Sequence, residues 1–358
     1  MTRTLVLIYG TRPDAIKLGP VAYELRAMGH EVIPICTGQH TDLLRGTPAE
    51  TDLHGDVSLG LTPTDHPFEW VEHAKAPIVS TLRALSPDAV VVQGDTSSAL
   101  AGTRAANALN FPLIHVEAGV RSGCLTDPFP EEKIRREIDH LSDLLLAPTD
   151  HCYQNLLNEC HDLHARNTRA IVTGNTGISA LHRYTGVHIG SWPRPDILIT
   201  LHRREFRLSP NCTKALYSLL EGAEKWNDLT FIWPVHPAMR PYLPEATAIP
   251  RNVLLTDPLL YSQCAYLASR VRGILTDSGG LSEEAAALGV PCVHARFHTD
   301  RPEAVEAGIA HCLPPTPEGF HEAIQFLAEQ RLPRRPSDCF GTADAATNVA
   351  RAITEFLR

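Results

Sequence analysis

The feature that most constrains this chain is a repeated alternation of short apolar runs with segments of helical spacing. The runs are continuously apolar, and each is followed by Gly, Thr or Asp. This rhythm is typical of a parallel sheet that helices cover on both faces. We expect strands at 4–10, 31–37, 89–95, 112–118, 143–148 and 170–174, and then at 196–202, 229–236, 253–257, 273–277 and 291–296.

The rhythm breaks once, in a stretch with Pro, Trp and Gly at 185–195, and then restarts. A length of 358 residues also favours two domains. We therefore predict an α/β protein with two Rossmann-like, doubly wound domains, over 1–185 and 190–340, and a cleft between them. The segment 341–358 has apolar residues at helical spacing, which predicts a terminal helix that could pack on either domain.

Charge and composition exclude several classes of function. Lys and Arg number 32 against 41 Asp and Glu, a net charge of −9, so we expect neither nucleic acid nor a membrane as partner. The apolar run near the N-terminus is too short for a signal peptide or a membrane span, which predicts a cytoplasmic protein.

Metal and disulfide chemistry are not expected either. The nine cysteines are an odd number and form no C-x-x-C pair, which predicts reduced thiols. One cluster deserves comparison with a zinc site, and its residues are Cys152, Cys160, His161 and His164. It lacks a fourth ligand at zinc-like spacing, so a solvated helix is the better interpretation.

Candidate site residues follow the apolar runs, because ligands of doubly wound sheets bind beyond the carboxyl ends of the strands. The turn after the first run lacks the G-x-G-x-x-G pattern, so no nicotinamide cofactor is expected. Arg12 at that turn and Lys17 one and a half helical turns later could offer positive charge to a phosphate. An exposed Arg and a surface Lys are the ordinary alternative.

Carboxylates form the next group of candidates. Asp95 and Glu117 stand at strand ends, where burying a carboxylate is costly unless a site uses it. Glu131 follows Pro130 at a predicted helix start and shares a face with Arg135, an arrangement that helix stabilisation alone would explain. Acids facing cations across a gap suit general acid/base chemistry at a sugar carbon.

The second half contains a strand–turn–helix pattern at 276–289. Ser278, Gly279 and Gly280 would begin the helix, where backbone N–H groups can hold a diphosphate. Glu284 would lie one turn further, within reach of ribose hydroxyls, although an ordinary capped helix is the alternative. His202 ends a predicted strand and could neutralise or protonate a leaving diphosphate, although a lone histidine is more often structural.

Taken in order, the motifs of this chain resemble the non-hydrolysing UDP-N-acetylglucosamine 2-epimerase family. They are G-T-R-P-D-A-I-K (10–17), T-G-Q-H (37–40), Q-G-D-T (93–96), H-V-E-A-G-V-R-S-G (115–123), P-F-P-E-E (128–132), T-G-N-T (173–176), H-R-R-E (202–205), P-V-H (234–236), L-T-D-S-G-G-L-S-E-E (275–284) and T-D-R-P-E-A-V-E-A-G (299–308). The resemblance implies a GT-B-like fold with twin Rossmann-like halves, a homodimer and no cofactor.

The resemblance also implies a reaction and a role for each matching residue. Loss of the C2 proton and of UDP gives a 2-acetamidoglucal, and re-addition with the proton on the other face converts UDP-GlcNAc to UDP-ManNAc. By motif match the catalytic candidates are Asp95, Glu117, Glu131, Arg135, His202 and Lys17. The candidates for binding substrate and nucleotide are Arg12, Gln39, His236, Ser278, Gly279, Gly280, Glu284 and Arg301. Which carboxylate takes the C2 proton stays open.

Several positions depart from the family pattern. Ile134 and Phe206 each stand in place of an Asn, Cys264 in place of an aromatic residue near the uracil, and Thr41 in place of an Arg, while the segment 48–68 is short. In bacterial members that short segment helps to contact a second UDP-GlcNAc that activates the enzyme. The departures predict weakened activation or a modified aminosugar substrate. A hydrolysing epimerase, a GT-B glycosyltransferase and a non-catalytic nucleotide-sugar binder remain as alternatives.

Overall fold

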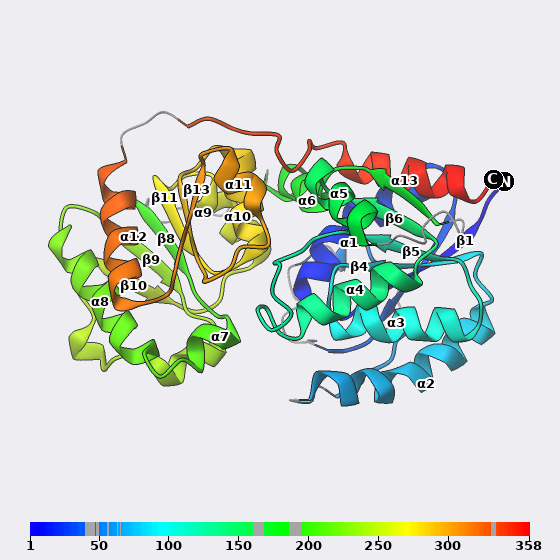
Figure 1. Cartoon of the computed structure of the whole chain (residues 1–358), viewed down its shortest axis with the longest axis horizontal. Coiled ribbons are helices and arrows are strands. Elements are labelled where there is room, and N and C mark those ends of the chain that lie inside the picture. Colours follow the sequence, from blue (N-terminus) through cyan, green and yellow to red (C-terminus); the bar gives the residue numbers. More distant parts are fainter. Residues whose placement is uncertain are drawn as a thin grey trace. The chain divides into compact units, whose positions relative to one another are not determined.

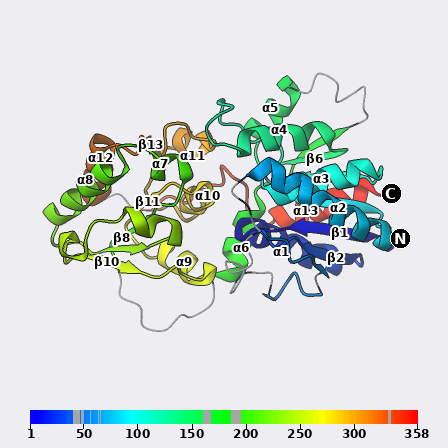
Figure 2. The same cartoon turned by 90° about the horizontal axis from the view of Figure 1, so that it is seen from below.

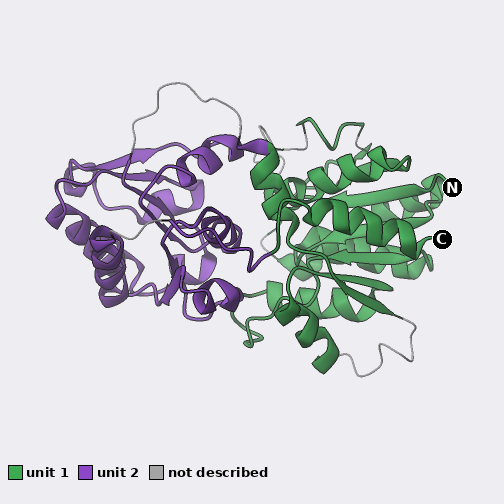
Figure 3. Ribbon diagram, turned by 90° about the horizontal axis from the view of Figure 1, so that it is seen from above, with its two compact units in different colours: residues 1–183, 341–358 green, residues 184–340 purple. Residues whose placement is uncertain are grey.

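The chain divides into two units, of which unit 1 is Met1–Arg183 with Gly341–Arg358 and unit 2 is Tyr184–Phe340. Figure 3 colours unit 1 green and unit 2 purple. The structure is a computed structural model that describes residues 1–39, 47, 50–55, 57–62, 64, 66–159, 168–185, 195–330 and 334–358.

Unit 1 is a parallel sheet with helices on both faces, as labelled in Figure 1. Its strands are β1 (Thr4–Tyr9), β2 (Glu31–Cys36), β3 (Val57–Ser58), β4 (Ala89–Gln93), β5 (Leu113–Val116), β6 (Leu144–Ala147) and β7 (Arg169–Val172), in the order β3-β2-β1-β4-β5-β6-β7. Its helices are α1 (Arg12–Ala27), α2 (Pro67–Leu85), α3 (Ser97–Ala108), α4 (Glu131–Leu141), α5 (Asp150–Glu159), α6 (Thr176–Tyr184), which ends at the boundary with unit 2, and α13 (Ala345–Phe356).

Strand β1 shows why continuous apolar runs form this sheet. Leu5 and Leu7 face α1 and α13, whereas Val6 and Ile8 face α2 and α3. All four side chains are at most 1% exposed. Burial of each contributes about 1.5–3 kcal/mol, so a polar residue at any of these positions would be costly.

The last helix, α13, packs on unit 1 against α1. Figure 2 shows α13 in red beside α1 in blue. Val349 and Ile353 are fully buried there, and the Arg3 guanidinium donates a 2.7 Å hydrogen bond to the carbonyl of Leu357. The sequence leaves the partner of this helix open, because its apolar face alone does not identify the surface that it covers.

Unit 2 is a second parallel sheet, with strands β8 (Ile197–Thr200), β9 (Phe231–Pro234), β10 (Val253–Thr256), β11 (Gly273–Thr276), β12 (Cys292–Ala295) and β13 (Ala310–Leu313) in the order β10-β9-β8-β11-β12-β13. Its helices are α7 (Arg204–Arg207), α8 (Cys212–Lys225), α9 (Tyr261–Ala268), α10 (Gly279–Leu288), α11 (Pro302–Glu306) and α12 (Pro317–Glu329), with the 3₁₀ helices η3 (Pro237–Tyr242) and η4 (Ala246–Ala248). Trp233, Phe206, Phe231 and Phe320 are the largest buried side chains of the core shared by α8 and α12.

Both sheets reverse their strand order once, and this reversal positions the candidate residues. In unit 1 the reversal lies between β1 and β4, and in unit 2 between β8 and β11. Ligands of doubly wound sheets bind at such points, beyond the carboxyl ends of the strands. Asp95, His202 and Ser278 lie in the loops that follow three of these four strands, and α1, which follows the fourth, carries Arg12 and Lys17.

The predicted α/β class and doubly wound sheets are confirmed, and every predicted apolar run overlaps an observed strand. The structure adds β3, which has only two residues, and β13, which pairs with β12. The terminal helix begins at Ala345 rather than near 341, because Gly341 has a φ of 86° and approaches Gly174 too closely for a Cβ atom.

Within the described residues, no helix is long and apolar enough to cross a membrane. The same residues contain no cluster of three His, Cys, Asp or Glu side chains arranged for a metal, and no pair of described cysteines forms a disulfide. Of the cluster compared with a zinc site, Cys152 is buried on α5, and Cys160, His161 and His164 lie outside the described residues.

Candidate active site

In unit 1 the turn between β1 and α1 is closed by Asp14. Its Oδ2 atom accepts hydrogen bonds from the N–H groups of Gly10 and Thr11, both at 3.1 Å, and from Thr96 Oγ1 at 3.2 Å. Burial raises the pKa of Asp14 to about 7, against the effect of these donors. Arg12 is the first residue of α1 and lies half-buried at this turn. Asp14 therefore joins the loops after β1 and β4, the two strands of the reversal.

Glu117 lies just beyond β5 and is held by two donors. Its Oε2 atom accepts hydrogen bonds from Lys17 Nζ on α1 and from Gln93 Nε2 at the end of β4, each at 2.5 Å. The side chains of Lys17 and Glu117 are 10% and 11% exposed. Glu117 has a φ of 71°, a left-handed conformation that costs a residue with a side chain about 1–3 kcal/mol. The surrounding structure thus maintains a strained backbone that presents this carboxylate.

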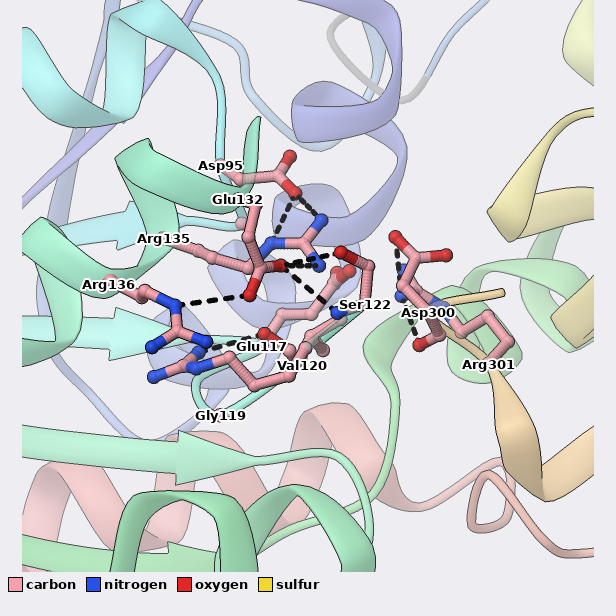
Figure 4. A network of polar contacts seen from close by, with 12 residues as sticks. Asp95, Glu117, Gly119, Val120, Ser122, Glu132, Arg135, Arg136, Asp300 and Arg301 are labelled. Atoms are coloured by element: carbon pink, nitrogen blue, oxygen red, sulfur yellow. Dashed lines mark hydrogen bonds and ion pairs between the residues drawn. The ribbon is translucent and has the colours of Figure 1, made fainter. Parts of the chain in front are cut away.

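Asp95 lies just beyond β4 and pairs with Arg135 on α4, as Figure 4 shows. Arg135 Nε donates to Asp95 Oδ2 at 3.0 Å, and Arg135 NH1 donates to Glu132 Oε2 at 3.4 Å. The Arg135 side chain is 3% exposed, whereas that of Asp95 is 26% exposed. The guanidinium thus holds a carboxylate that solvent and ligands can still reach. Glu131 is the half-buried first residue of α4.

Gln39, a predicted substrate contact, is engaged within unit 1. Its side-chain oxygen accepts hydrogen bonds from the backbone N–H and the Oγ of Ser98, at 3.0 and 2.7 Å. Ser98 lies in the first turn of α3. The Gln39 carbonyl therefore ties the loop after β2 to this helix, and its amide nitrogen is the atom that could donate to a ligand.

In unit 2 the start of α10 has the form predicted for an anion site. Ser278 is the N-cap residue, but its side chain makes no capping hydrogen bond. A Cβ on Gly280 would meet nothing within 4 Å, so the backbone is open at this point. The first N–H groups of a helix have no partner within the helix, and they attract anions. This geometry favours the diphosphate interpretation over the ordinary capped helix.

His202 lies just beyond β8 and faces Asp277, which follows β11. The His202 Nδ1 atom is 2.9 Å from Asp277 Oδ1, and Asp277 Oδ2 accepts from the N–H groups of His202 and Arg203 at 2.7 and 2.8 Å. Burial opposes ionisation of Asp277, but His202 and these donors outweigh burial and lower the pKa of Asp277 to about 2. The carboxylate thereby orients the imidazole and leaves Nε2 as the atom for a ligand.

His236 and Glu284 are the next two predicted binding residues in unit 2. The His236 ring lies 5.5 Å from that of His202, and its Nδ1 accepts from the N–H of Ala238 at 3.2 Å. Glu284 Oε1 accepts from the hydroxyl of Tyr261 at 2.9 Å. Burial and the negative charge of Glu284 together raise the pKa of Tyr261 well above its usual value. Tyr261 thus remains a donor and orients the Glu284 carboxylate.

Arg301, predicted to bind sugar or phosphates, is buried at the start of α11. It pairs with Glu283, and its NH1 donates to the carbonyl of Asp300 at 3.0 Å. Figure 4 labels Arg301 and Asp300. A Cβ on Gly279 would lie 3.6 Å from the guanidinium. The Arg301 guanidinium therefore lies directly beside the first residue of α10, where the carboxylates of Glu283 and Asp300 hold it in place.

The structure brings four predicted residues of unit 1, Lys17, Asp95, Glu117 and Arg135, to the ends of the neighbouring strands β4 and β5. In unit 2 it groups His202 with His236, and Arg301 with Gly279 at the α10 start. Sequence reasoning did not identify the residues that hold these groups, namely Gln93, Glu132, Asp277, Tyr261 and Glu283. An acid directly before Ser278 is a signal that could have found Asp277, because it too stands at a strand end.

Two of the residues that depart from the expected family pattern, Ile134 and Phe206, have side chains that pack in hydrophobic cores. Ile134 is 1% exposed and packs in the core between α4, α2 and α3. Phe206 is 2% exposed and packs edge-on against Phe320, with ring centres 5.4 Å apart. Cys264 is half-buried on α9, the helix that begins with Tyr261. Ile134 and Cys264 thus lie on helices that also carry residues of the candidate sites, Ile134 on α4 with Arg135 and Cys264 on α9 with Tyr261, whereas Phe206 lies on α7.

Comparison with known proteins agrees with this geometry. The family model described as UDP-N-acetylglucosamine 2-epimerase matches residues 24–354. A protein of Thermotoga maritima named as a putative UDP-N-acetylglucosamine 2-epimerase is 37% identical over 97% of this chain and 95% of its own. The crystal structure of UDP-GlcNAc 2-epimerase from Neisseria meningitidis bound to UDP-GlcNAc has a TM-score of 0.87 and 30% identity, and the match covers 98% of this chain and 100% of that one.

A more distant likeness concerns the fold alone. A solved structure of the spinosyn rhamnosyltransferase SpnG with spinosyn aglycone has a TM-score of 0.54 and 16% identity over 99% of this chain and 96% of that one. The fold is thus GT-B-like, with two Rossmann-like units.

Proposed function

We propose that this chain, which belongs to the UDP-N-acetylglucosamine 2-epimerase family, interconverts UDP-GlcNAc and UDP-ManNAc without hydrolysing either. The observation that carries the proposal is the pair of carboxylates just beyond the neighbouring strands β4 and β5. Asp95 is held by Arg135 and Glu117 by Lys17. Two acids held in fixed positions can remove a proton and return one.

The proposed reaction is an elimination followed by an addition. A carboxylate removes the proton at C2, the C2–H electrons form the C1=C2 double bond, and the C1–O bond to UDP breaks. The intermediates are 2-acetamidoglucal and UDP. A proton then adds to C2 on the opposite face while a UDP phosphate oxygen attacks C1. We assign the acid/base steps to Asp95, Glu117 and Glu131.

Lys17 and Arg135 have distinct roles in this scheme. The Lys17 ammonium, bonded to Glu117, would keep that carboxylate oriented near the reacting sugar. Arg135 would orient Asp95 and add positive charge as the diphosphate leaves. Without either cation, a carboxylate would move from the position that proton transfer at C2 requires.

We assign UDP binding mainly to unit 2. Gly279 and Gly280 would present N–H groups to the diphosphate and Ser278 its hydroxyl, with Arg301 beside them. Glu284, oriented by Tyr261, would accept from the ribose hydroxyls. His202 and His236 would neutralise the diphosphate, with Arg12 and Gln39 of unit 1 as further contacts. We also propose a homodimer, which light scattering of the purified protein would test.

The experiment that tests this function is incubation with UDP-GlcNAc in D₂O, followed by proton NMR of C1 and C2. Deuterium at C2 together with UDP-ManNAc is the expected result. Free ManNAc with UDP would identify a hydrolysing epimerase, in which water intercepts the intermediate. Binding of UDP-GlcNAc without exchange would contradict epimerisation of this substrate.

A further inference from the structure

A chain of ion pairs begins at Asp95 and continues through α4. Arg135 bridges Asp95 and Glu132, at 3.0 Å and 3.4 Å. Arg136 in turn bridges Glu132 and Glu159, with its Nε 3.1 Å from Glu132 Oε1 and its NH1 3.0 Å from Glu159 Oε1. Figure 4 shows the part of this chain around Glu132. Acids and guanidiniums alternate at every step.

The chain of ion pairs then returns to its starting point. Arg121 joins Glu159 at 2.7 Å to Asp139 at 2.8 Å. Asp139 Oδ1 lies 2.6 Å from His115 Nδ1. His115 Nε2 lies 2.8 Å from the backbone carbonyl of Gly94, which directly precedes Asp95 in the sequence. The eight side chains therefore form a closed ring, which we call the charge ring.

The partners of His115 determine its protonation. A carbonyl can only accept, so Nε2 must donate to Gly94. Asp139 also receives the N–H of Gly119 at 3.2 Å and the guanidinium of Arg121 on its other oxygen. The Arg121 guanidinium and the Gly119 N–H both favour the ionised form of Asp139. An ionised Asp139 only accepts, so Nδ1 must donate as well, and a histidine that donates from both nitrogens is an imidazolium.

Charge balance in the charge ring leads to the same conclusion. Apart from His115, the charge ring consists of four carboxylates and three guanidiniums, which together carry a net charge of −1. His115 is 0% exposed, and its strand neighbours Val92 and Leu145 are apolar. The charged groups at its edges are Asp139 on α4 and, beyond it, Arg121 from the loop after β5. A positive charge on His115 makes the ring neutral, whereas an uncompensated buried charge is costly.

We propose that His115 is a positively charged positioning residue that couples the loops of Asp95 and Glu117. Through Nε2 it fixes the carbonyl of Gly94, and through Asp139 it fixes the N–H of Gly119. These two backbone groups flank the two strand ends that carry the carboxylates. The catalytic part of this inference rests on the proposed function, whereas the charge of His115 does not.

The charge is tested by NMR of protein labelled with ¹⁵N at histidine. A neutral imidazole gives one nitrogen signal of the unprotonated type, and an imidazolium gives none. For wild type we expect both His115 nitrogens to give protonated-type signals at neutral pH, with the signals assigned by their loss in His115→Gln. An unprotonated-type nitrogen on His115 at neutral pH would overturn the proposal, whatever the activity.

Asp139→Asn supplies the matching variant, because it keeps the shape and removes the anion. Its His115 should show one unprotonated nitrogen at neutral pH, and the shift of these signals assigns them even if His115→Gln fails to fold. A His115 that stays doubly protonated in Asp139→Asn would contradict the pairing argument.

The positioning role is tested by the steady-state kinetics of His115→Gln. We expect kcat to fall about 100-fold while KM for UDP-GlcNAc changes by less than about threefold, because the carboxylates lose alignment and not the substrate contacts. The control is His151→Gln, the same change at an exposed position on α5 of the same unit. An unchanged kcat in folded His115→Gln would overturn the role. A wild type without any exchange would instead overturn the proposed function and leave the NMR result standing.

Discussion

Lys17 and Glu117 lie 100 positions apart in the sequence, yet the Lys17 ammonium donates a 2.5 Å hydrogen bond to the Glu117 carboxylate. The contact joins the first helix of the chain to the end of β5, and both side chains are only about a tenth exposed. A pair so shielded from solvent is little screened by salt. Its role in the reaction can therefore be tested by substitution under ordinary buffer conditions.

Replacing Lys17 with Met should lower kcat for C2 deuterium exchange by at least about 100-fold, because Glu117 loses its cation and its orientation. Exchange would be measured by NMR with saturating UDP-GlcNAc. The control is Lys214→Met, at an exposed position on α8, which should retain full activity. Equal rates for Lys17→Met and wild type would remove Lys17 from the proposed site.

Replacing Arg135 with Met should lower the free energy of unfolding by about 3 kcal/mol, because two acids lose a cation that is itself 3% exposed. Urea unfolding measures the change. The matched control is Arg104→Met, whose guanidinium is 24% exposed and pairs with Glu137 and Glu72 at the surface. That variant should lose about 1 kcal/mol or less, and a loss equal to that of Arg135→Met would contradict the ranking.

Replacing Ser278 with Ala should weaken UDP binding and leave the stability of unit 2 nearly unchanged, because the Ser278 side chain does not cap α10. We expect the Kd for UDP to rise about tenfold in calorimetry, because the Ser278 hydroxyl, which alanine lacks, would no longer donate a hydrogen bond to the charged diphosphate. Thr316→Ala is the control, since Thr316 caps α12 by accepting from Gly319 at 3.1 Å. It should cost about 1 kcal/mol of stability with no change in Kd.

Asp277 should make the stability of the protein sensitive to acid. Its pKa is lowered to about 2 in the fold, from 3.8 for the unperturbed group. The stabilisation is therefore present above about pH 4 and is lost as the pH falls toward 2, by about 2 kcal/mol in total. Asp277→Asn should show a shallower loss of unfolding free energy across that range, whereas Asp228→Asn, at an exposed position, should follow wild type. Parallel curves for Asp277→Asn and wild type would contradict this assignment.

Activation by a second substrate molecule should be weak or absent. Thr41, which lies outside the described residues, stands in place of an Arg of the family pattern, and the segment 48–68, most of which the structure describes, is short. We expect initial rates to rise hyperbolically with UDP-GlcNAc concentration. Strongly sigmoidal rates would show that activation is retained.

Most strands were predictable because they are buried on both faces, as Leu5 to Ile8 illustrate, and a continuous apolar run is the direct result. The edge strands β7 and β10 are largely exposed and were predicted from their apolar sequences alone. The strand β13 was missed because its sequence, Ala-His-Cys-Leu, is short and only partly apolar, and its pairing with β12 decides its conformation. The partner of α13 could not be predicted, because it depends on which apolar surface the other helices leave uncovered.

The location of the candidate residues also followed from sequence, since the strand-end rule identified Asp95, Glu117 and His202. Their partners did not. Glu132 sits beside Glu131 in the sequence, yet the structure shows it bonded to Arg135 and Arg136, and no spacing rule distinguishes these neighbouring acids in advance. Sequence spacing also does not predict the pairing of His115 with Asp139, because a contact between residues 24 positions apart depends on the packing of α4 against β5.

The return of the chain to unit 1 at Gly341 makes unit 2 an insertion within it. During synthesis, the ribosome completes all of unit 2 before it makes α13, so the part of α1 that packs against α13 stays uncovered until residues 345–356 emerge. Unit 2 can complete its hydrophobic core first, whereas unit 1 exposes an apolar surface throughout the synthesis of unit 2. A nascent chain arrested just before 341 should therefore recruit chaperones through unit 1 and not through unit 2.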